Sequence, residues 1–130
     1  MGTVAVLADD LIWASRLVAA VERAGARAVR LSTEEELRTV IEADAMAELG
    51  PDDRAQRLLG VLIDLNGRRY DGIAAVALAA QAGKPVIAAA QHDDQVTRKR
   101  ALDAGASRVF AYAKLFEDGP QVVKRWLVAA

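Results

Sequence analysis

Five short apolar runs recur along this chain, and a stretch with helical spacing separates each run from the next. The runs are Val4–Ala8, Ala28–Leu31, Leu59–Ile63, Val86–Ala90 and Arg108–Tyr112. The first, third and fourth are apolar on both faces, as strands are when helices cover both sides of a parallel sheet. Repeated strand–helix units favour right-handed crossovers between parallel strands. The pattern therefore predicts an α/β fold.

The helical stretches have recognisable ends. Helices are predicted at Leu11–Ala24, Thr33–Leu49, Ile73–Ala82, Gln95–Ala104 and Pro120–Val128. Ser32 and Glu35 are a candidate capping box for the second of these, and Gly50–Pro51 a candidate stop. The region from residue 33 to 58 is longer than one crossover needs. We interpret it as a long helix followed by an extra turn over Pro51–Arg57.

The length of the chain limits the sheet that these units can form. All 130 residues are expected to form one domain. An eight-fold α/β barrel needs about 250 residues, so five units predict an open sheet instead. The expected fold is a doubly wound, five-stranded parallel sheet in the order 2-1-3-4-5, with helices on both faces.

Composition excludes several classes of function. Lys and Arg number 17 and Asp and Glu 18, so the net charge of −1 offers no footprint for nucleic acid or an anionic membrane. The absence of cysteine excludes disulfides, thiolate metal sites and cysteine nucleophiles. No apolar run approaches the roughly 18 residues of a membrane span, and no signal peptide opens the chain. A cytoplasmic, bacterial protein is the expectation.

Acidic residues follow two of the predicted strands. In an open α/β sheet, ligands bind beyond the carboxyl ends of the strands, where the strand order reverses. Asp9 and Asp10 follow the first strand and Asp64 ends the third, so the three carboxylates converge there. Two charges about 4 Å apart repel by roughly 4 kcal/mol at an effective dielectric of 20. Mg²⁺, a basic side chain or protonation would offset this repulsion; Asp9 and Asp10 can also simply cap the helix that follows.

Motifs at the ends of the strands carry a family resemblance. They are Asp9–Asp10, Asp64, Asp71–Gly72, Lys84–Ile87 and Ala101–Ala106. In this order they resemble a response-regulator receiver domain over nearly the whole chain. The resemblance implies that Asp9 and Asp10 hold Mg²⁺ with Asp64 and the backbone carbonyl of Asn66. It also implies that Asp64 accepts a phosphoryl group from a histidine kinase.

Three positions depart from the family pattern. Ala90 stands where the family has a Ser or Thr whose hydroxyl binds the phosphoryl group. Tyr112 stands where the family has Lys, and Lys114 is an alternative match two residues later. A longer or bulged fifth strand would let Lys114 point the same way. Arg68 replaces the loop proline after Asp64. The residues that would hold the metal are thus all present, whereas the residues that would respond to the phosphoryl group are altered.

The function implied is an atypical, stand-alone receiver-like domain that is not an enzyme and signals through protein partners, either a histidine kinase or an output protein. Two versions stay open: Asp64 accepts phosphate with an impaired switch, or the domain is a pseudo-receiver that works without phosphate. A flavodoxin-like binder of flavin or another phosphorylated ligand is a third hypothesis, although Asp9–Ile12 offers negative charge where such a ligand needs backbone donors. No Ser-His or Cys-His arrangement supports a small hydrolase.

A partner surface is expected on the fourth helix, the fifth strand and the last helix, which receivers commonly use. A homodimer there would involve Arg98, Arg100, Phe110 and Trp126, because interfaces favour Arg and aromatic residues. The lone His92 and the basic run Arg98–Arg100 are otherwise expected to be solvated surface.

Overall fold

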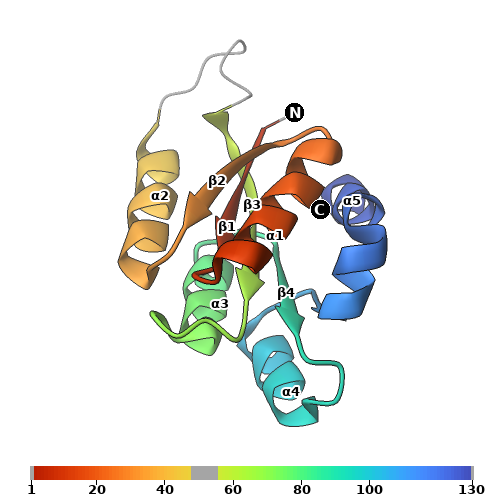
Figure 1. Ribbon diagram of the computed structural model, residues 1–130. Helices are drawn as coiled ribbons and strands as arrows, with labels where there is room; N and C mark the ends of the chain where they lie inside the picture. The colour runs from red at the N-terminus through yellow and green to blue at the C-terminus, as the bar shows by residue number, and fades with distance from the viewer. Residues whose placement is uncertain (1, 48–55, 130) are drawn as a thin grey trace.

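The computed structural model describes residues 2–47 and 56–129. A five-stranded sheet runs through it in the order β2-β1-β3-β4-β5, with every neighbouring pair parallel (Figure 1). The strands are β1 (Thr3–Leu7), β2 (Arg27–Leu31), β3 (Leu58–Asp64), β4 (Val86–Ala90) and β5 (Arg108–Ala111). The predicted fold class and strand order are confirmed.

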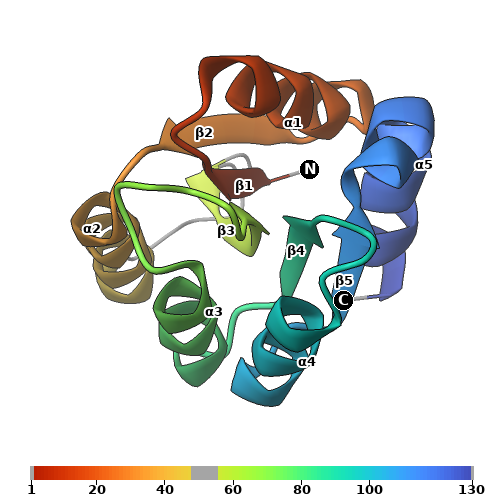
Figure 2. The same cartoon turned by 60° about the horizontal axis from the view of Figure 1, so that its bottom comes forward.

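Five helices connect the strands and cover the sheet. They are α1 (Leu11–Arg23), α2 (Glu34–Met46), α3 (Gly72–Gln81), α4 (Gln95–Ala104) and α5 (Tyr112–Ala129). Helices α1 and α5 lie on one face and α2, α3 and α4 on the other (Figure 2). Among residues 2–47 and 56–129, no helix is long and apolar enough to cross a lipid bilayer.

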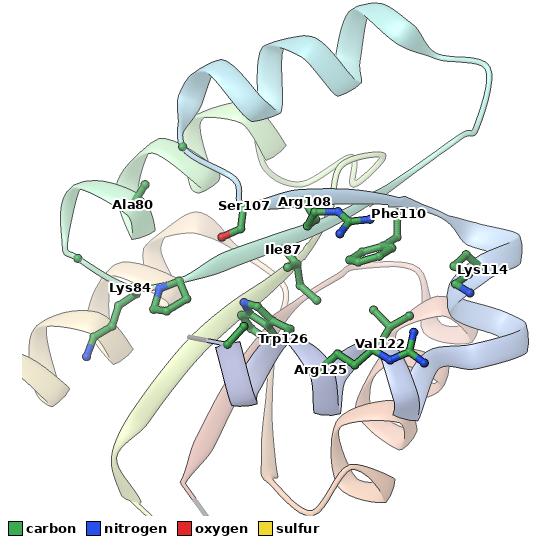
Figure 3. Close-up of a pocket in the computed structure, with 14 residues that line it drawn as sticks. Ala80, Lys84, Ile87, Ser107, Arg108, Phe110, Lys114, Val122, Arg125 and Trp126 are labelled. Carbon is green, nitrogen blue, oxygen red and sulfur yellow. The ribbon is translucent and has the colours of Figure 1, made fainter.

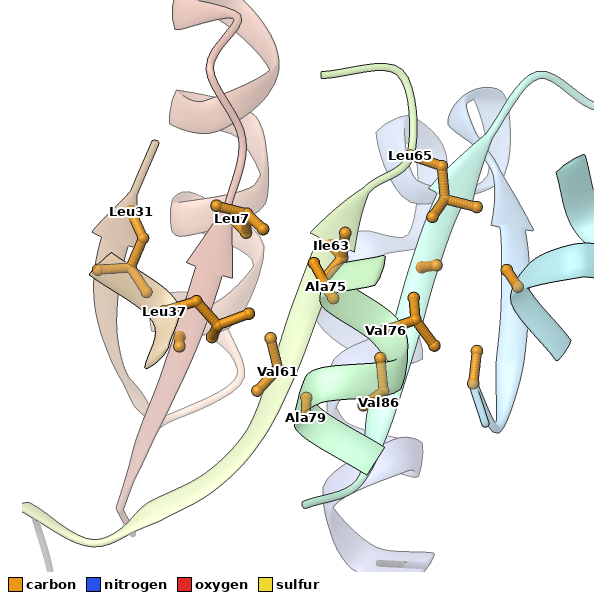
Figure 4. Packing of buried hydrophobic residues seen from close by; sticks show 14 of the residues in the cluster. Leu7, Leu31, Leu37, Val61, Ile63, Leu65, Ala75, Val76, Ala79 and Val86 are labelled. Atoms are coloured by element: carbon orange, nitrogen blue, oxygen red, sulfur yellow. The ribbon is translucent and has the colours of Figure 1, made fainter. Parts of the chain in front are cut away.

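The two faces of the sheet produce two apolar cores. Alternate residues of each strand point to opposite faces, so Leu7 and Ile63 pack toward α2–α4 while Val6 and Leu62 pack toward α1 and α5. Figure 4 shows the first core, in which side chains of α2 and α3 meet those of the strands. Burying one such side chain contributes about 1.5–3 kcal/mol. This double burial explains why three of the runs are apolar throughout.

The capping box of α2 lies one residue further along than predicted. Thr33 is the N-cap, and its hydroxyl accepts from the Glu36 N–H at 3.1 Å. The Glu36 carboxylate reaches back to the N–H and hydroxyl of Ser32. The box therefore pairs Thr33 with Glu36, because Ser32 still belongs to the chain that enters the helix. α2 ends at Met46; the predicted end at residue 49 and most of the turn over 51–57 lie outside the described residues.

The last helix begins earlier than predicted. β5 ends at Ala111 and α5 starts at once with Tyr112, before a kink at Asp118. Pro120 follows the kink, in the first turn of the second half, where its missing N–H costs nothing. Lys114 therefore lies on a helix, and the idea of a longer fifth strand that carries it is wrong.

Trp126 belongs to the core rather than to an exposed interface. It is 8% exposed and packs with the α1–α5 core. Its ring lies against Gly60: a Cβ at that position would come within 2.6 Å of Trp126 Cζ2. Little of the ring is therefore left for an interface, because α5 turns this face of it inward; the dimer itself stays a prediction.

Candidate functional site

The three predicted carboxylates line one pocket at the carboxyl ends of the strands. The pocket measures about 520 Å³. Its lining residues are Asp9, Asp10, Trp13, Asp64, Asn66, Arg68, Arg69, Gln91 and Tyr112. The convergence follows from topology, because β1 and β3 are parallel neighbours whose carboxyl ends meet at one edge of the sheet.

Asp64 is the buried acid of this pocket. It ends β3 and is 3% exposed. Its Oδ1 accepts from the Asn66 N–H at 3.1 Å and from the Tyr112 hydroxyl. Burial raises the pKa of the Asp64 carboxyl, and the charges of Asp9 and Asp10 raise it further; together they outweigh the two donors.

Tyr112, the first residue of α5, lies directly after β5 and reaches Asp64. Its ring lies against Trp13, with the centroids 4.5 Å apart at 40°. Burial raises the pKa of the Tyr112 hydroxyl, as does its bond to the Asp64 carboxylate, so the hydroxyl stays a donor. Lys114 instead pairs with Asp118 at 2.8 Å, about half exposed, and does not line this pocket. Of the two candidates that the sequence offered, Tyr112 is the one at the site.

Asp9 and Asp10 have separate partners. Asp9 Oδ2 accepts from the backbone N–H groups of Arg68 and Arg69 at 2.7 and 2.6 Å, so it holds the loop after β3 against the end of β1. Asp10 caps α1: its Oδ1 accepts from the Trp13 N–H at 2.9 Å. Capping, the alternative left open by the sequence, therefore describes Asp10.

Two residues near the pocket carried no signal in the sequence. The Tyr70 hydroxyl lies 2.6 Å from the carbonyl oxygen of Asp64 and 3.1 Å from that of Leu7, so it links the ends of β3 and β1. A Cβ on Gly67 would overlap the Tyr70 ring, which explains the glycine at that position. Gln91 follows β4 and brings an amide to the pocket. Neither Tyr70 nor Gln91 belongs to a motif. The position of Gln91 directly after a strand is the one signal that could have suggested it as a site residue.

Ala90 ends β4 in the core. It is fully buried, packs in the cluster on the α2–α4 face and pairs with Ala111. It lacks a hydroxyl and is not among the residues that line the pocket. A group bound beside Asp64 would thus receive no donor from this side chain.

The acidic residues are not gathered into a ready metal site. Among the residues that the structure describes, no three His, Cys, Asp or Glu side chains are placed to hold a metal ion together. One oxygen of each carboxylate is instead engaged by a protein donor. Magnesium binding by Asp9, Asp10, Asp64 and the Asn66 carbonyl stays a prediction.

Known structures resemble this chain over almost its whole length. A response regulator in red-light signalling of R. palustris is 22% identical, with a TM-score of 0.73 and coverage of 96% of this chain and 90% of that one. A receiver domain from Rhodospirillum rubrum is 24% identical, with a TM-score of 0.72 and coverage of 97% and 94%. The receiver domain of the TMAO respiratory system regulator TorR is 16% identical, with a TM-score of 0.78 and coverage of 99% and 98%.

No protein-family model and no curated protein sequence matches the chain. The resemblance therefore lies in the arrangement of the strands and helices rather than in closely similar sequences. The shared arrangement is five parallel strands in the order 2-1-3-4-5 with five covering helices. The chain has the fold of a response-regulator receiver domain.

Proposed function

We propose that this chain is a receiver-like signalling domain that acts through protein partners and does not depend on phosphate. The observation that carries the proposal is the hydrogen bond from the Tyr112 hydroxyl to Asp64 Oδ1. The acceptor carboxylate of the fold is thereby bound by a neutral donor of the chain itself. The domain would occupy one conformation, and its output would depend on partner binding.

The chemistry of Asp64 supports this version over phosphoryl acceptance. A carboxylate that attacks a phosphoryl group must be ionised and must have an oxygen free to form the bond. The raised pKa of Asp64 weakens the first condition, and the Asn66 and Tyr112 donors both occupy Oδ1, so Oδ2 is the oxygen left to form the bond. Tyr112 provides no cation and Ala90 provides no hydroxyl that would follow the transferred group.

Protein donors also offset the repulsion among the three carboxylates, for which the sequence left Mg²⁺, a basic side chain and protonation open. The Arg68 and Arg69 amides bind Asp9, the start of α1 binds Asp10, and Tyr112 binds Asp64. Each donor lowers the cost of keeping three carboxylates together. We therefore propose that the resting site needs no Mg²⁺.

A partner surface is proposed beside this pocket. Leu11, Ile12 and Phe116 are 70%, 64% and 63% exposed at the starts of α1 and α5. The guanidinium of Arg16 lies over both the Trp13 and the Phe116 rings, at 5.2 and 4.5 Å. Large exposed apolar side chains with Arg and aromatic neighbours are typical of protein interfaces. A dimer through α4, β5 and α5 stays a second prediction, with Val96 and Leu102 as its exposed apolar residues.

Phosphodonor labelling tests the proposal directly. The wild-type chain is incubated with acetyl phosphate and Mg²⁺, and its intact mass is measured over time. We expect no stable phosphorylated species. The double variant Ala90→Thr/Tyr112→Lys restores the family residues and is expected to gain a mass increment that Asp64→Asn removes. Rapid labelling of the wild type at Asp64, with a change in conformation, would favour the phosphoacceptor version.

A further inference from the structure

A second and larger pocket lies between α5 and the beginnings of β4 and β5, toward the amino ends of the strands. It measures about 970 Å³ and extends from the start of β4 to α5. Its floor is apolar and includes Ile87, Phe110, Val122 and Trp126 (Figure 3). A concave site of this size with an apolar floor is suited to a small organic ligand.

Every charged side chain on the wall of this pocket is cationic. Lys84, Arg108, Lys114 and Arg125 line it, and none of the described lining residues is acidic. Lys84 is engaged elsewhere: its ammonium pairs with Asp44 at 2.6 Å and points away from the pocket (Figure 3). Lys114 pairs with Asp118. Arg108 and Arg125 form no direct ion pair with another described residue, although Arg125 lies near enough to Asp118 to help lower the pKa of that carboxyl. Arg108 is therefore the main cation offered to a ligand, with Arg125 beside it.

The wall also holds an unsatisfied donor. Trp126 is 8% exposed, and its indole Nε1–H is buried with no hydrogen-bond partner among the described residues. Buried donors in native proteins almost always have a partner, so an unpaired one needs an explanation. The polar side-chain groups of this pocket are all able to donate, because Ser107 adds a hydroxyl to the cations and the indole.

We infer that this pocket binds a small amphipathic anion, an apolar or aromatic body that carries a carboxylate, sulfonate or phosphate. The body would cover the half-buried Phe110 ring and the exposed edges of Val122 and Trp126, above the fully buried Ile87, and the anionic group would face Arg108 and Arg125. Arg108 already stacks on Phe110, with the guanidinium 5.2 Å from the ring centroid, so the cation and the apolar floor form one surface. A ligand acceptor near Trp126 would pair its N–H after a small movement of the ring.

Indole N–H signals in a ¹⁵N–¹H spectrum provide the test, because the chain contains two tryptophans. The probe is 2-naphthalenesulfonate, with 2-naphthalenemethanol as its neutral analogue and a 2-naphthyl trimethylammonium salt as its cationic analogue. We expect the sulfonate to shift the Trp126 signal in a saturable manner. The Trp13 signal is the internal control, since Trp13 lines the other pocket. The cationic analogue should leave Trp126 unchanged.

Two double variants separate charge recognition from folding. Arg108→Gln/Arg125→Gln should bind the sulfonate about tenfold more weakly or worse. Lys99→Gln/Lys124→Gln removes the same charge from exposed positions outside the pocket and should bind as the wild type does. Equal binding of the neutral analogue and the sulfonate would overturn the anion assignment. The small-ligand site would be overturned if millimolar sulfonate left the Trp126 N–H signal unshifted. A shift of that signal that depends on protein concentration and not on the probe would overturn it as well.

Discussion

Tyr112 and Asp64 lie 48 residues apart in the chain and share one hydrogen bond at the carboxyl edge of the sheet. The hydroxyl of Tyr112 donates, and Asp64 Oδ1 accepts. A lysine at the end of β5 would bring a positive charge to this acid, whereas tyrosine brings only a neutral donor. The carboxylate therefore has a raised pKa, and it is held by a side chain whose own pKa burial raises.

Removing this donor should destabilise the fold. Tyr112→Phe leaves a buried carboxylate with one donor fewer, and we expect the free energy of unfolding at pH 7 to fall by about 1–3 kcal/mol. Urea unfolding measures the loss. In an Asp64→Asn background the same substitution should cost less, because a neutral amide is less demanding of a donor. Equal losses in the two backgrounds would show that Tyr112 stabilises the fold through packing on Trp13 instead.

Asp64→Asn should itself stabilise the protein at neutral pH. Because the pKa of Asp64 is raised above its ordinary 3.8, the folded state binds this proton more tightly than the unfolded state. The contribution of Asp64 to stability is therefore greatest below pH 3.8 and is lost as pH rises through the folded pKa. We expect Asp64→Asn to gain about 1 kcal/mol over the wild type at pH 7. The gain should shrink toward pH 3 in a series of unfolding curves; a gain independent of pH would contradict the assignment.

Asp44 should show the opposite dependence on pH. Burial alone would raise its pKa, but the bonds from Lys84 at 2.6 Å and the Leu58 N–H at 2.8 Å lower it. Its contribution is therefore present above pH 3.8 and is lost as pH falls through the folded pKa. Lys84→Met leaves a largely buried carboxylate unpaired and should cost about 1–3 kcal/mol at pH 7.

The exposed pair between Lys99 and Asp103 is the matched control for this prediction. Its side chains are 78% and 68% exposed, against 21% and 10% for Lys84 and Asp44. Lys99→Met should therefore change the free energy of unfolding by less than about 0.5 kcal/mol. Equal costs for the two lysine variants would mean that the Asp44 contacts contribute little to stability.

Gly60 and Trp126 form a second coupled pair. A Cβ at position 60 would lie 2.6 Å from Trp126 Cζ2 and 2.9 Å from the Pro85 carbonyl oxygen. Gly60→Ala should therefore lower the free energy of unfolding by about 1–3 kcal/mol through overpacking. Trp126→Phe shortens the ring and should recover part of that loss in the double variant, as thermal unfolding would show. Strictly additive losses would place the clash on the Pro85 carbonyl instead.

The sequence predicted the parts of the site that follow from topology. Asp9 follows β1 and Asp64 ends the neighbouring parallel strand β3, so the fold class alone places them at one edge. The position of Tyr112 follows from its spacing from Gly105. The partners of Asp9 could not be predicted, because they depend on how the loop backbone at Arg68 and Arg69 turns its N–H groups.

The remaining differences between prediction and structure lie at the ends of helices, where two local structures suit the same residues. Arg108–Tyr112 reads as a strand of five apolar or amphipathic residues, yet Tyr112 already begins α5. A residue at such a boundary has no pattern that separates the two states, and only packing against Trp13 and Asp64 decides it. The register of the α2 capping box was ambiguous for a similar reason, since Ser32 and Thr33 are each followed by Glu three residues later.

Magnesium tests how completely protein donors have replaced the cation. A ligand that binds only the folded state stabilises it by RT ln(1 + [L]/Kd), about 2.7 kcal/mol at 100 times Kd. Protein donors already bind one oxygen of each carboxylate, namely Oδ2 of Asp9 and Oδ1 of Asp10 and Asp64, so a metal ion competes with bonds that are already made. We expect the melting temperature of the wild type to change little in millimolar Mg²⁺ or Mn²⁺, relative to a matched ionic strength of NaCl. Tyr112→Phe removes one of the two donors on Asp64 Oδ1 and should give a larger rise, which Asp64→Ala in the same background should abolish. A clear rise in the wild type that is lost in Asp64→Ala would instead show that the carboxylates rearrange around the ion, as the family resemblance implies.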